Sequence, residues 1–398
     1  MERMRRLLLL VAVLVAVDTM LFAVLTPLLP HFVDELSLSK TRAGMLVAAY
    51  AAGALIGGLP GGAAAARLGP RRAVLVGLTG MGLASLGFAL AQGFWSLFAA
   101  RLLQGLGSSF TWAGAFAWLI AAAPRERRGE LIGSALGAAV FGALFGPVMG
   151  AAAALVGRTA IFSGLAALSV VLMAITLRLE TAPIEHPSLG SVGRALRERR
   201  FLAGLGLMAL ASLLFGILGV LCPLRLSGAG WGAAAIGGIW LTGAGFESVT
   251  APLVGRMIDR RGALLPTRVA LGLGVLCALG LATGPRPLVY APLIVLSAAA
   301  FGVLFTPAFA LIADGAEHVR LPQGMAFGFM SAAWAVGAFI GPSSAGALAG
   351  ATGDWIPFVL GAALCGAALA LSRLRSDHVG AAVVVDGLAG DPAGVGGE

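Results

Sequence analysis

The string GALFGPVMG at residues 142–150 decides the fold, because it returns as GAFIGPSSA at residues 337–345. Three identical residues, 195 positions apart, anchor the repeat: Gly142, Gly146 and Pro147 in the first copy, Gly337, Gly341 and Pro342 in the second. Two loop residues recur in the same way, Arg67 with Gly69 in one half and Arg260 with Gly262 in the other. Both copies lie at the same place among long apolar segments. Such duplication is typical of helical membrane transporters.

The composition places the chain in a lipid bilayer. Hydrophobic residues make up 59% of the 398 residues and charged residues only 11%, with a mean hydropathy of +0.96. A helix needs about 20 apolar residues to cross the hydrocarbon core. Twelve segments qualify, at residues 7–33, 41–66, 72–92, 95–123, 129–153, 157–178, 202–226, 232–256, 263–283, 287–313, 323–350 and 355–373. The sequence therefore predicts an all-α membrane protein with twelve transmembrane helices in two pseudo-symmetric six-helix bundles.

The basic residues are distributed by membrane side rather than clustered. With a cytoplasmic N-terminus, five of the 27 Lys and Arg residues lie on the opposite side, namely Lys40, Arg42, Arg158, Arg225 and Arg286. Arg101 falls inside a span, and the other 21 lie on the cytoplasmic side. This asymmetry predicts cytoplasmic termini, and we expect a bacterial inner membrane as the location. It also explains the net charge of +9 without a nucleic-acid partner.

A charged stretch at residues 179–201 divides the chain. It contains Pro183, Pro187 and Gly190, and we interpret it as a cytoplasmic linker. The other predicted units are an N-terminal bundle at 1–178, a C-terminal bundle at 202–373 and a Gly-rich, disordered cytoplasmic tail at 374–398.

Nothing in the sequence indicates an enzyme, a metal site or a bound cofactor. Cys222, Cys277 and Cys365 lack metal-binding spacing, and no phosphate-binding loop or HExxH string occurs. Without a nucleotide site, we expect a proton gradient to supply the energy.

Several motifs resemble signatures of the major facilitator superfamily. The strings GAAAARLGPRR (62–72) and GRMIDRRG (255–262) match its cytoplasmic loop signature, with Ala66 at the Asp position of the first copy. RLLQGLGSSF (101–110) matches its fourth helix. The helix-five string resembles the motif of the superfamily's antiporters, carried here by Gly142, Gly146, Pro147 and Gly150.

The resemblance implies a gate on the cytoplasmic side. Its residues would be Gly62, Arg67, Gly69, Gly255, Asp259, Arg260, Gly262 and Asp314. Two simpler alternatives stay open: the loop arginines serve only to orient the chain, and Asp314 belongs to a solvated loop cluster.

The first span resembles that of vesicular amine transporters and their bacterial drug:proton antiporter relatives. The matching string is DTMLFAVLTPLLP, residues 18–30. The resemblance implies that Asp18 faces a cationic substrate. Aromatic contacts to that cation would come from Trp112, Phe246 or Trp334. Three of the family's polar positions hold other residues here, namely Tyr50, Cys222 and Ser331.

Three charged residues fall within predicted spans, where charge is costly and usually functional. Asp18 lies near the middle of the first span, Glu247 near the middle of the eighth and Arg101 in the fourth. Burial favours a neutral carboxyl group and a bound cation favours the ionised one, so two such carboxylates suit proton exchange. Arg101 either perturbs a carboxylate or acts as a structural clamp. An ion pair between Arg101 and Glu247 is a further structural alternative.

Together these features predict a monomeric secondary transporter of the multidrug efflux type. It would export a small amphipathic or cationic compound in exchange for protons, with the lipid bilayer as its only other partner. A uniporter or symporter for a neutral metabolite is the first alternative. The others are a lipid flippase, which requires a lateral opening towards lipid, and a non-transporting membrane sensor.

Overall fold

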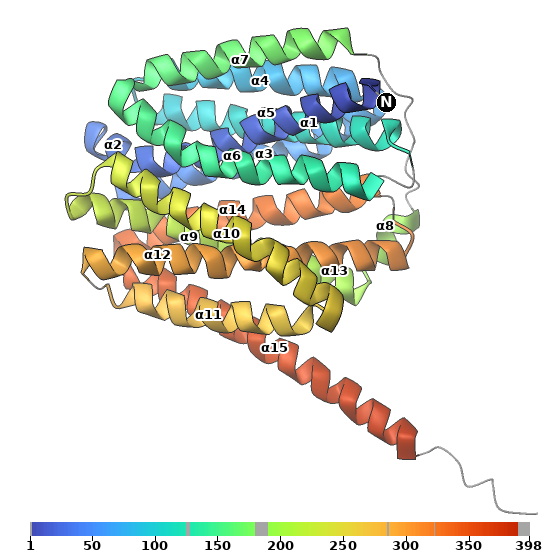
Figure 1. The fold of residues 1–398 in the computed structure, drawn as a ribbon. Coiled ribbons are helices and arrows are strands. Elements are labelled where there is room, and N and C mark those ends of the chain that lie inside the picture. Colours follow the sequence, from blue (N-terminus) through green and yellow to red (C-terminus); the bar gives the residue numbers. More distant parts are fainter. Residues whose placement is uncertain (1, 125–127, 180–189, 285, 322, 389–398) are drawn as a thin grey trace, which may run out of the picture.

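The computed structural model describes residues 2–124, 128–179, 190–284, 286–321 and 323–388. Every regular element in these ranges is an α-helix (Figure 1). The helices are α1 Glu2–Ala23, α2 Leu25–Glu35, α3 Lys40–Arg67, α4 Pro70–Leu90, α5 Phe94–Ala122, α6 Arg128–Val156, α7 Arg158–Arg178, α8 Gly190–Ala195, α9 Arg199–Gly228, α10 Ala233–Arg261, α11 Leu264–Ala282, α12 Pro287–Val303, α13 Phe305–His318, α14 Gln323–Thr352 and α15 Trp355–Leu388. Residues 180–189 of the predicted linker lie outside the described residues.

These helices confirm the predicted all-α membrane fold. In the described part of the chain, ten helical stretches are long and apolar enough to cross a bilayer, with α1–α2 and α12–α13 each forming one stretch. The other two predicted spans are α5 and α10, each 29 residues long. α5 carries Arg101 and α10 carries Glu247, two of the charged residues expected inside the membrane.

Two spans are interrupted by the same short motif. α1 gives way to α2 at Val24, and α12 gives way to α13 at Leu304. In both places Thr-Pro follows two positions later, ending at Pro27 and Pro307. A proline there cannot donate a hydrogen bond to the carbonyl group four residues earlier, so the regular helix is interrupted. Hydropathy alone predicts continuous helices at both places.

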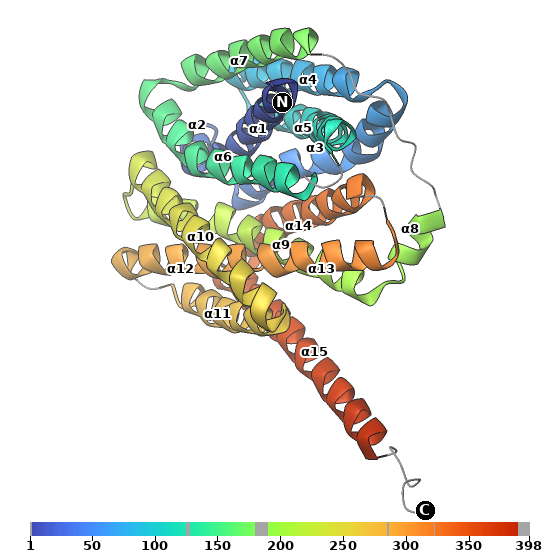
Figure 2. The ribbon, with the colours of Figure 1, turned by 45° about the vertical axis from the view of Figure 1, so that its right-hand side comes forward.

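The helices form two bundles that lie side by side (Figures 1 and 2). One bundle contains α1–α7 and the other α9–α15, and the short α8 lies on the path between them. We call the end at which the N-terminus and α8 lie the inner end, and the opposite end the outer end. The distribution of basic residues predicts that the inner end faces the cytoplasm.

The last helix continues into the predicted tail. The sequence predicts disorder from residue 374, whereas α15 continues as a helix to Leu388 and extends beyond the bundle (Figure 1). No proline occurs after Pro357 until Pro392, so each further residue of an established helix adds one more backbone hydrogen bond. Residues 389–398 lie outside the described residues.

The repeated glycines pack α6 against α1 and α14 against α9. A Cβ atom at Gly142 would meet the carbonyl oxygen of Ala16, and one at Gly337 would meet that of Ala209. The other motif glycines make similar contacts: Gly146 with Met20 and Ala23, Gly150 with Val24 and Pro27, and Gly341 with Leu213. Small residues allow helices to approach closely in a membrane. The two halves therefore pack in the same way.

The two bundles meet at the outer end. Gly44 of α3 and Gly346 of α14 face each other, and a Cβ atom at either position would collide with the backbone of the other helix. Gly237 of α10 packs in turn on Pro147 of α6. Two pairs of helices, α3 with α14 and α6 with α10, thus close the outer end.

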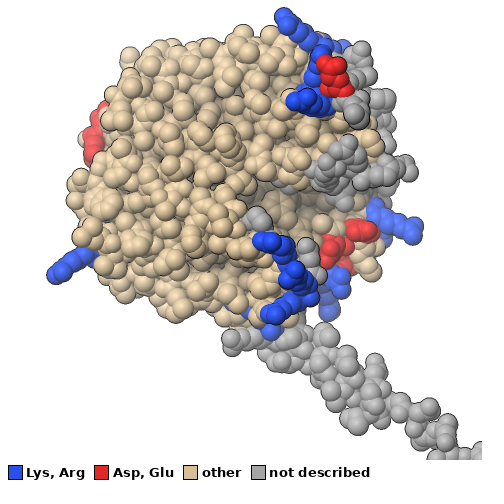
Figure 3. Space-filling view, in the orientation of Figure 1, with Lys and Arg blue, Asp and Glu red and all other residues tan. Residues whose placement is uncertain are grey.

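Towards the inner end, α6 and α10 separate. None of the described residues of α10 from Ala244 to Arg261 is fully buried, whereas Ile236 and Gly237 are. Figure 3 shows the surface hollowed between α6 and α10 on this side. The bundles therefore pack closely at the outer end, and α6 and α10 diverge towards the inner end, where Phe116 of α5 still stacks on Phe327 of α14.

An ion pair between Lys40 of α3 and Asp354, just before α15, joins the bundles at the outer end. We expect Asp354→Asn to raise the outward-open population about two- to fivefold, because partly exposed ion pairs contribute about 0.5–1 kcal/mol. Electron-paramagnetic-resonance distances between spin labels at the outer ends of α3 and α14 measure this population. The charge-swapped pair Lys40→Asp with Asp354→Lys should restore the closed distance. Unchanged distances in Asp354→Asn would contradict this role.

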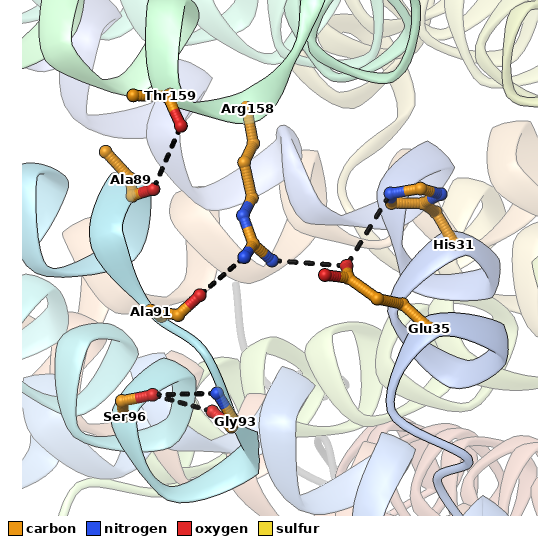
Figure 4. A network of polar contacts seen from close by, with 8 residues as sticks. All are labelled: His31, Glu35, Ala89, Ala91, Gly93, Ser96, Arg158 and Thr159. Atoms are coloured by element: carbon orange, nitrogen blue, oxygen red, sulfur yellow. Dashed lines mark hydrogen bonds and ion pairs between the residues drawn. The ribbon is translucent and has the colours of Figure 1, made fainter.

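Other outer-end cations also bind protein groups. Arg158, at the start of α7, donates to the carbonyl oxygen of Ala91 over 2.5 Å and to Glu35 over 3.2 Å (Figure 4). Arg225 donates to the carbonyl oxygen of Gly284 over 2.5 Å. The first carbonyl follows α4 and the second follows α11, and cations are favourable at the C-terminal ends of helices. These arginines therefore tie neighbouring helices together.

Candidate functional site

Asp18 is the acceptor of a buried hydrogen-bond network. It lies on α1 and its residue surface is only 3% exposed. The Tyr50 hydroxyl group of α3 lies 3.0 Å from each carboxylate oxygen. Nε1 of Trp112, on α5, donates to Oδ2 of Asp18 over 2.6 Å. Three helices of the N-terminal bundle thus converge on one carboxylate.

The close approach of α3 to α5 brings the two donors together. A Cβ atom at Gly53 would meet the carbonyl oxygen of Leu102, and one at Gly105 would meet that of Tyr50. Because these positions are glycine, the helix backbones touch and Tyr50 reaches the same carboxylate as Trp112. From the sequence, Trp112 was expected only as an aromatic contact and Tyr50 only as a departure from the family. A hydroxyl group inside a span was the signal that Tyr50 needs a polar partner.

Arg101 clamps the end of α1 beside the interrupted part of the first span. It is 1% exposed, and it donates to the carbonyl oxygens of Leu21 over 2.8 Å and Phe22 over 3.1 Å. Its guanidinium group lies over the Tyr50 ring, 4.9 Å from the centroid. It also lies close enough to Asp18 for electrostatic attraction. This geometry supports the structural clamp, and within the described residues Arg101 makes no ion pair with Glu247.

Gln104, one turn further along α5, completes the clamp. Its Oε1 atom accepts a hydrogen bond from Nη1 of Arg101 over 2.6 Å. Nε of Arg101 and Nε2 of Gln104 are buried donors with no acceptor among the described residues. Buried donors normally find an acceptor, so these two suit an acceptor group of a ligand or a bound water molecule.

We expect Arg101→Gln to lower the free energy of unfolding by about 2–3 kcal/mol. The reason is that hydrogen bonds from a charged donor to the α1 carbonyl groups are lost at a buried site. Thermal unfolding of the detergent-solubilised protein measures the change. Arg42→Gln, which removes an arginine whose main contact is the Phe94 ring at 5.6 Å, is the matched control and should change stability little. Equal stabilities of the two variants would contradict the clamp.

An aromatic series leads from Asp18 to the other bundle. The ring of Phe22 lies 5.2 Å from that of Tyr50 and 5.0 Å from that of Trp334, on α14. A second branch stacks Trp112 on Phe116 at 5.3 Å and Phe116 on Phe327 of α14 at 5.1 Å. Aromatic rings near a carboxylate suit an organic cation. Of the three predicted aromatic residues, two therefore belong to this series.

Phe246, the third predicted aromatic residue, is not part of the series. Its side chain lies on α10 and is 49% exposed, with no ring contact among the described residues. Phe22, Phe116 and Phe327, in contrast, were not named from the sequence. Their spans are so apolar that no pattern shows which side of each helix faces the other bundle.

Glu247 lies on α10 beside the interrupted tenth span. It is partly buried, and a Cβ atom at Gly302 would collide with its carboxylate. Gly302 lies in the last turn of α12, just before the break at Leu304. No hydrogen bond or ion pair is found for the Glu247 carboxylate in the described part of the chain. This carboxylate therefore occupies an apolar niche that only glycine leaves open.

Neither carboxylate has a counterpart in the other half. Ala16 and Ala209 make equivalent contacts, so the counterpart of Asp18 is Ala211. The spacing of the repeated loops makes Ala54 the counterpart of Glu247. Each bundle thus contributes one carboxylate, and the two carboxylates lie on helices that do not correspond to each other in the repeat.

The predicted gate residues lie at the inner end. Gly69 and Gly262 both follow the repeated arginine with positive φ, +94° and +76°, which favours glycine in both loops. The side chains of Arg67, Arg260 and Asp314 are exposed. Two further gate residues are Gly62 and Gly255, where a Cβ atom would meet nothing within 4 Å. The last is Asp259, whose side chain lies outside the described residues.

The three departures from the amine transporters differ in environment. Tyr50 binds Asp18, as described above. Cys222 is buried, with its Sγ atom 3.5 Å from the hydroxyl group of Tyr290. Ser331 is exposed on α14. Among the described residues, no group of three or more His, Cys, Asp or Glu side chains is arranged to hold a metal ion.

Comparison with known proteins gives the same family. The model of the Major Facilitator Superfamily matches residues 9–321. Two similar proteins are the uncharacterized MFS-type transporters YcaD of Salmonella newport (strain SL254) and of Salmonella typhi. Each is 25% identical to this chain over 352 residues, which covers 86% of this chain and 88% of the relative.

Proposed function

The chain belongs to the major facilitator superfamily, and from this membership we propose that it exports a small amphipathic or cationic compound in exchange for protons. Membership makes it a multi-pass membrane transporter. The proposal includes the direction of transport, the proton coupling and a monomeric state. It also places the protein in the bacterial inner membrane with cytoplasmic termini, and it needs no cofactor because the proton gradient supplies the energy.

The observation that carries the proposal is the environment of Asp18. An ionised carboxylate in the middle of a span costs several kcal/mol unless it is neutralised or paired. Tyr50 and Trp112 donate hydrogen bonds to it without bringing a charge, and Arg101 attracts it without forming an ion pair among the described residues. A proton or a substrate cation can neutralise it directly, and the two exclude each other at one carboxylate. Such competition is the basis of exchange.

The aromatic series suits an organic cation better than a metal ion. Phe22, Trp112 and Trp334 surround the route from Asp18 to the C-terminal bundle. A cation over such rings gains about 0.5–2 kcal/mol, depending on its desolvation. The apolar rings also bind the hydrocarbon part of an amphipathic compound.

Glu247 is suited to bind and release the transported proton. Its carboxylate has no donor or cation among the described residues and lies against Gly302, in surroundings that favour the neutral form. Asp18 then binds the substrate cation while Glu247 gains and loses the proton on the opposite side of the interface. The α6–α10 and α3–α14 contacts would open and close around both sites. Gate residues at the inner end would stabilise the alternative state.

Transport by proteoliposomes with an internal pH dye tests the proposal. The panel should hold lipophilic cations, primary amines and neutral metabolites, each added across an imposed pH gradient. Proton flux that accompanies cationic compounds alone supports the proposal. Compound flux without proton movement would instead indicate a uniporter.

The lateral hollow between α6 and α10 favours a second candidate, transport of a lipid-like amphiphile (Figure 3). An opening to the side of the protein is what a flippase requires. A fluorescent phospholipid belongs in the same panel. Its movement between leaflets, at a rate above that of protein-free liposomes, would support this alternative.

A further inference from the structure

The inner end of α10 carries arginines for which the described part of the chain supplies no partner. Arg256, Arg260 and Arg261 line a pocket of about 360 Å³ together with Leu253 and Met257. Within the described part of the chain, none of the three arginines makes a hydrogen bond or an ion pair. Figure 3 shows basic side chains gathered at this end, beside the hollow.

The outer end differs in this respect. There Lys40 binds Asp354, Arg158 binds Glu35, and Arg225 binds a backbone carbonyl group. Three outer-end cations thus bind protein groups, whereas the α10 cluster presents its charge to the surroundings. An anionic ligand outside the chain can neutralise that charge.

The same face of α10 is apolar towards the middle of the membrane. Phe246, Val249 and Leu253 follow one another at helical spacing and are 49%, 67% and 51% exposed. The spacing continues to Arg256 and Arg260. Phe246 and Arg256 are ten residues, or about 15 Å, apart, which is half the thickness of a hydrocarbon core. This face therefore spans one leaflet, with an apolar part followed by a basic part.

We propose that this face of α10 binds an anionic phospholipid. Arg256, Arg260 and Arg261 hold the phosphodiester head group, and one acyl chain lies along the apolar part of the face. Guanidinium groups match pairs of phosphate oxygens, and basic pockets on the cytoplasmic side of transmembrane helices suit anionic head groups. The apolar part distinguishes a lipid from free phosphate.

Two acidic residues lie on the helix next to the pocket. Asp314 and Glu317 are exposed on the neighbouring α13 and form no ion pair with the α10 arginines among the described residues. Asp259 lies in the same stretch of sequence, with its side chain outside the described residues. The arginines outnumber the acidic groups of α10 by three to one in this stretch.

The proposed lipid face lies on the side of α10 away from Gly237, the residue that packs on α6. The binding site does not depend on what the protein transports. A failed test of lipid binding would therefore leave the proposal of proton-coupled export unaffected, and a failed transport test would leave the lipid site unaffected.

Thermal unfolding of the full-length protein in detergent tests the site. Phosphatidylglycerol, phosphatidylcholine of the same acyl chains and glycerol 3-phosphate are each titrated. Phosphatidylglycerol should raise the unfolding temperature with saturation, and the other two should not. Equal stabilisation by phosphatidylcholine would overturn the charge recognition, and equal stabilisation by glycerol 3-phosphate would overturn the lipid in favour of a free anion.

The variant Arg256→Gln with Arg261→Gln should bind phosphatidylglycerol about 25-fold more weakly, because each basic residue near an anionic head group contributes a factor of about five. Replacing both with Lys should retain most of the binding, which separates lost charge from a folding defect. Arg286→Gln, at the outer end, is the matched control and should bind like the original protein. Unchanged binding in the double Gln variant would overturn the proposal.

Discussion

Asp18→Asn is expected to abolish proton-coupled transport, with a loss of at least 100-fold in the initial rate. The amide retains the size of the carboxyl group and accepts hydrogen bonds from Tyr50 and Trp112, but it binds neither a proton nor a cation at this position. A substrate cation therefore loses the one carboxylate that the described residues place at the N-terminal bundle's aromatic site. Proteoliposome uptake of a lipophilic cation against a pH gradient measures the rate.

The matched control for this variant is Asp34→Asn. Asp34 lies on α2 and is exposed at the outer end of the same span. We expect it to transport at the original rate. If Asp18→Asn kept both its transport rate and its dependence on pH, Asp18 would be structural and the proposed exchange at this carboxylate would be wrong.

Glu247→Gln is expected to separate substrate binding from proton coupling. The amide resembles the protonated carboxyl group and fits the same niche against Gly302, so the fold and the substrate site should be retained. Uphill accumulation driven by a pH gradient should fall at least tenfold. Exchange of labelled for unlabelled substrate across the membrane, which needs no proton, should continue near the original rate.

Glu317→Gln is the control for that measurement. Glu317 is exposed on α13, at the inner end, and should show ordinary accumulation and exchange. Equal loss of accumulation and exchange in Glu247→Gln would place Glu247 in the substrate site or the fold. Full accumulation would remove it from the proton path altogether.

The helical fold could be predicted because the bilayer constrains it strongly. Each span must satisfy its own backbone hydrogen bonds, so apolar length alone locates it. The repeated strings around Gly142 and Gly337 then identify the two halves. The breaks at Val24 and Leu304 could also have been predicted from the sequence, because both precede the same Thr-Pro pair. Their common spacing becomes evident only once the two spans are compared.

The candidate site was predictable only in part. Charge in an apolar span singled out Asp18, Arg101 and Glu247, since few residues of that kind occur there. The partners of Asp18 depend on how α3 and α5 rotate about their axes, and glycine contacts rather than hydropathy set that rotation. Tyr50 therefore appeared as a departure from a family pattern, although it is a direct partner of the carboxylate.

The central claim is that a proton and a substrate cation are exchanged across two carboxylates of opposite bundles. The most direct test is accumulation of a lipophilic cation by proteoliposomes under an imposed pH gradient, with no other energy source. We expect the cation to accumulate several-fold above its external concentration and to leak back when a protonophore is added. Equilibration to equal concentrations, unaffected by the protonophore, would contradict it and make the protein a facilitator with structural carboxylates.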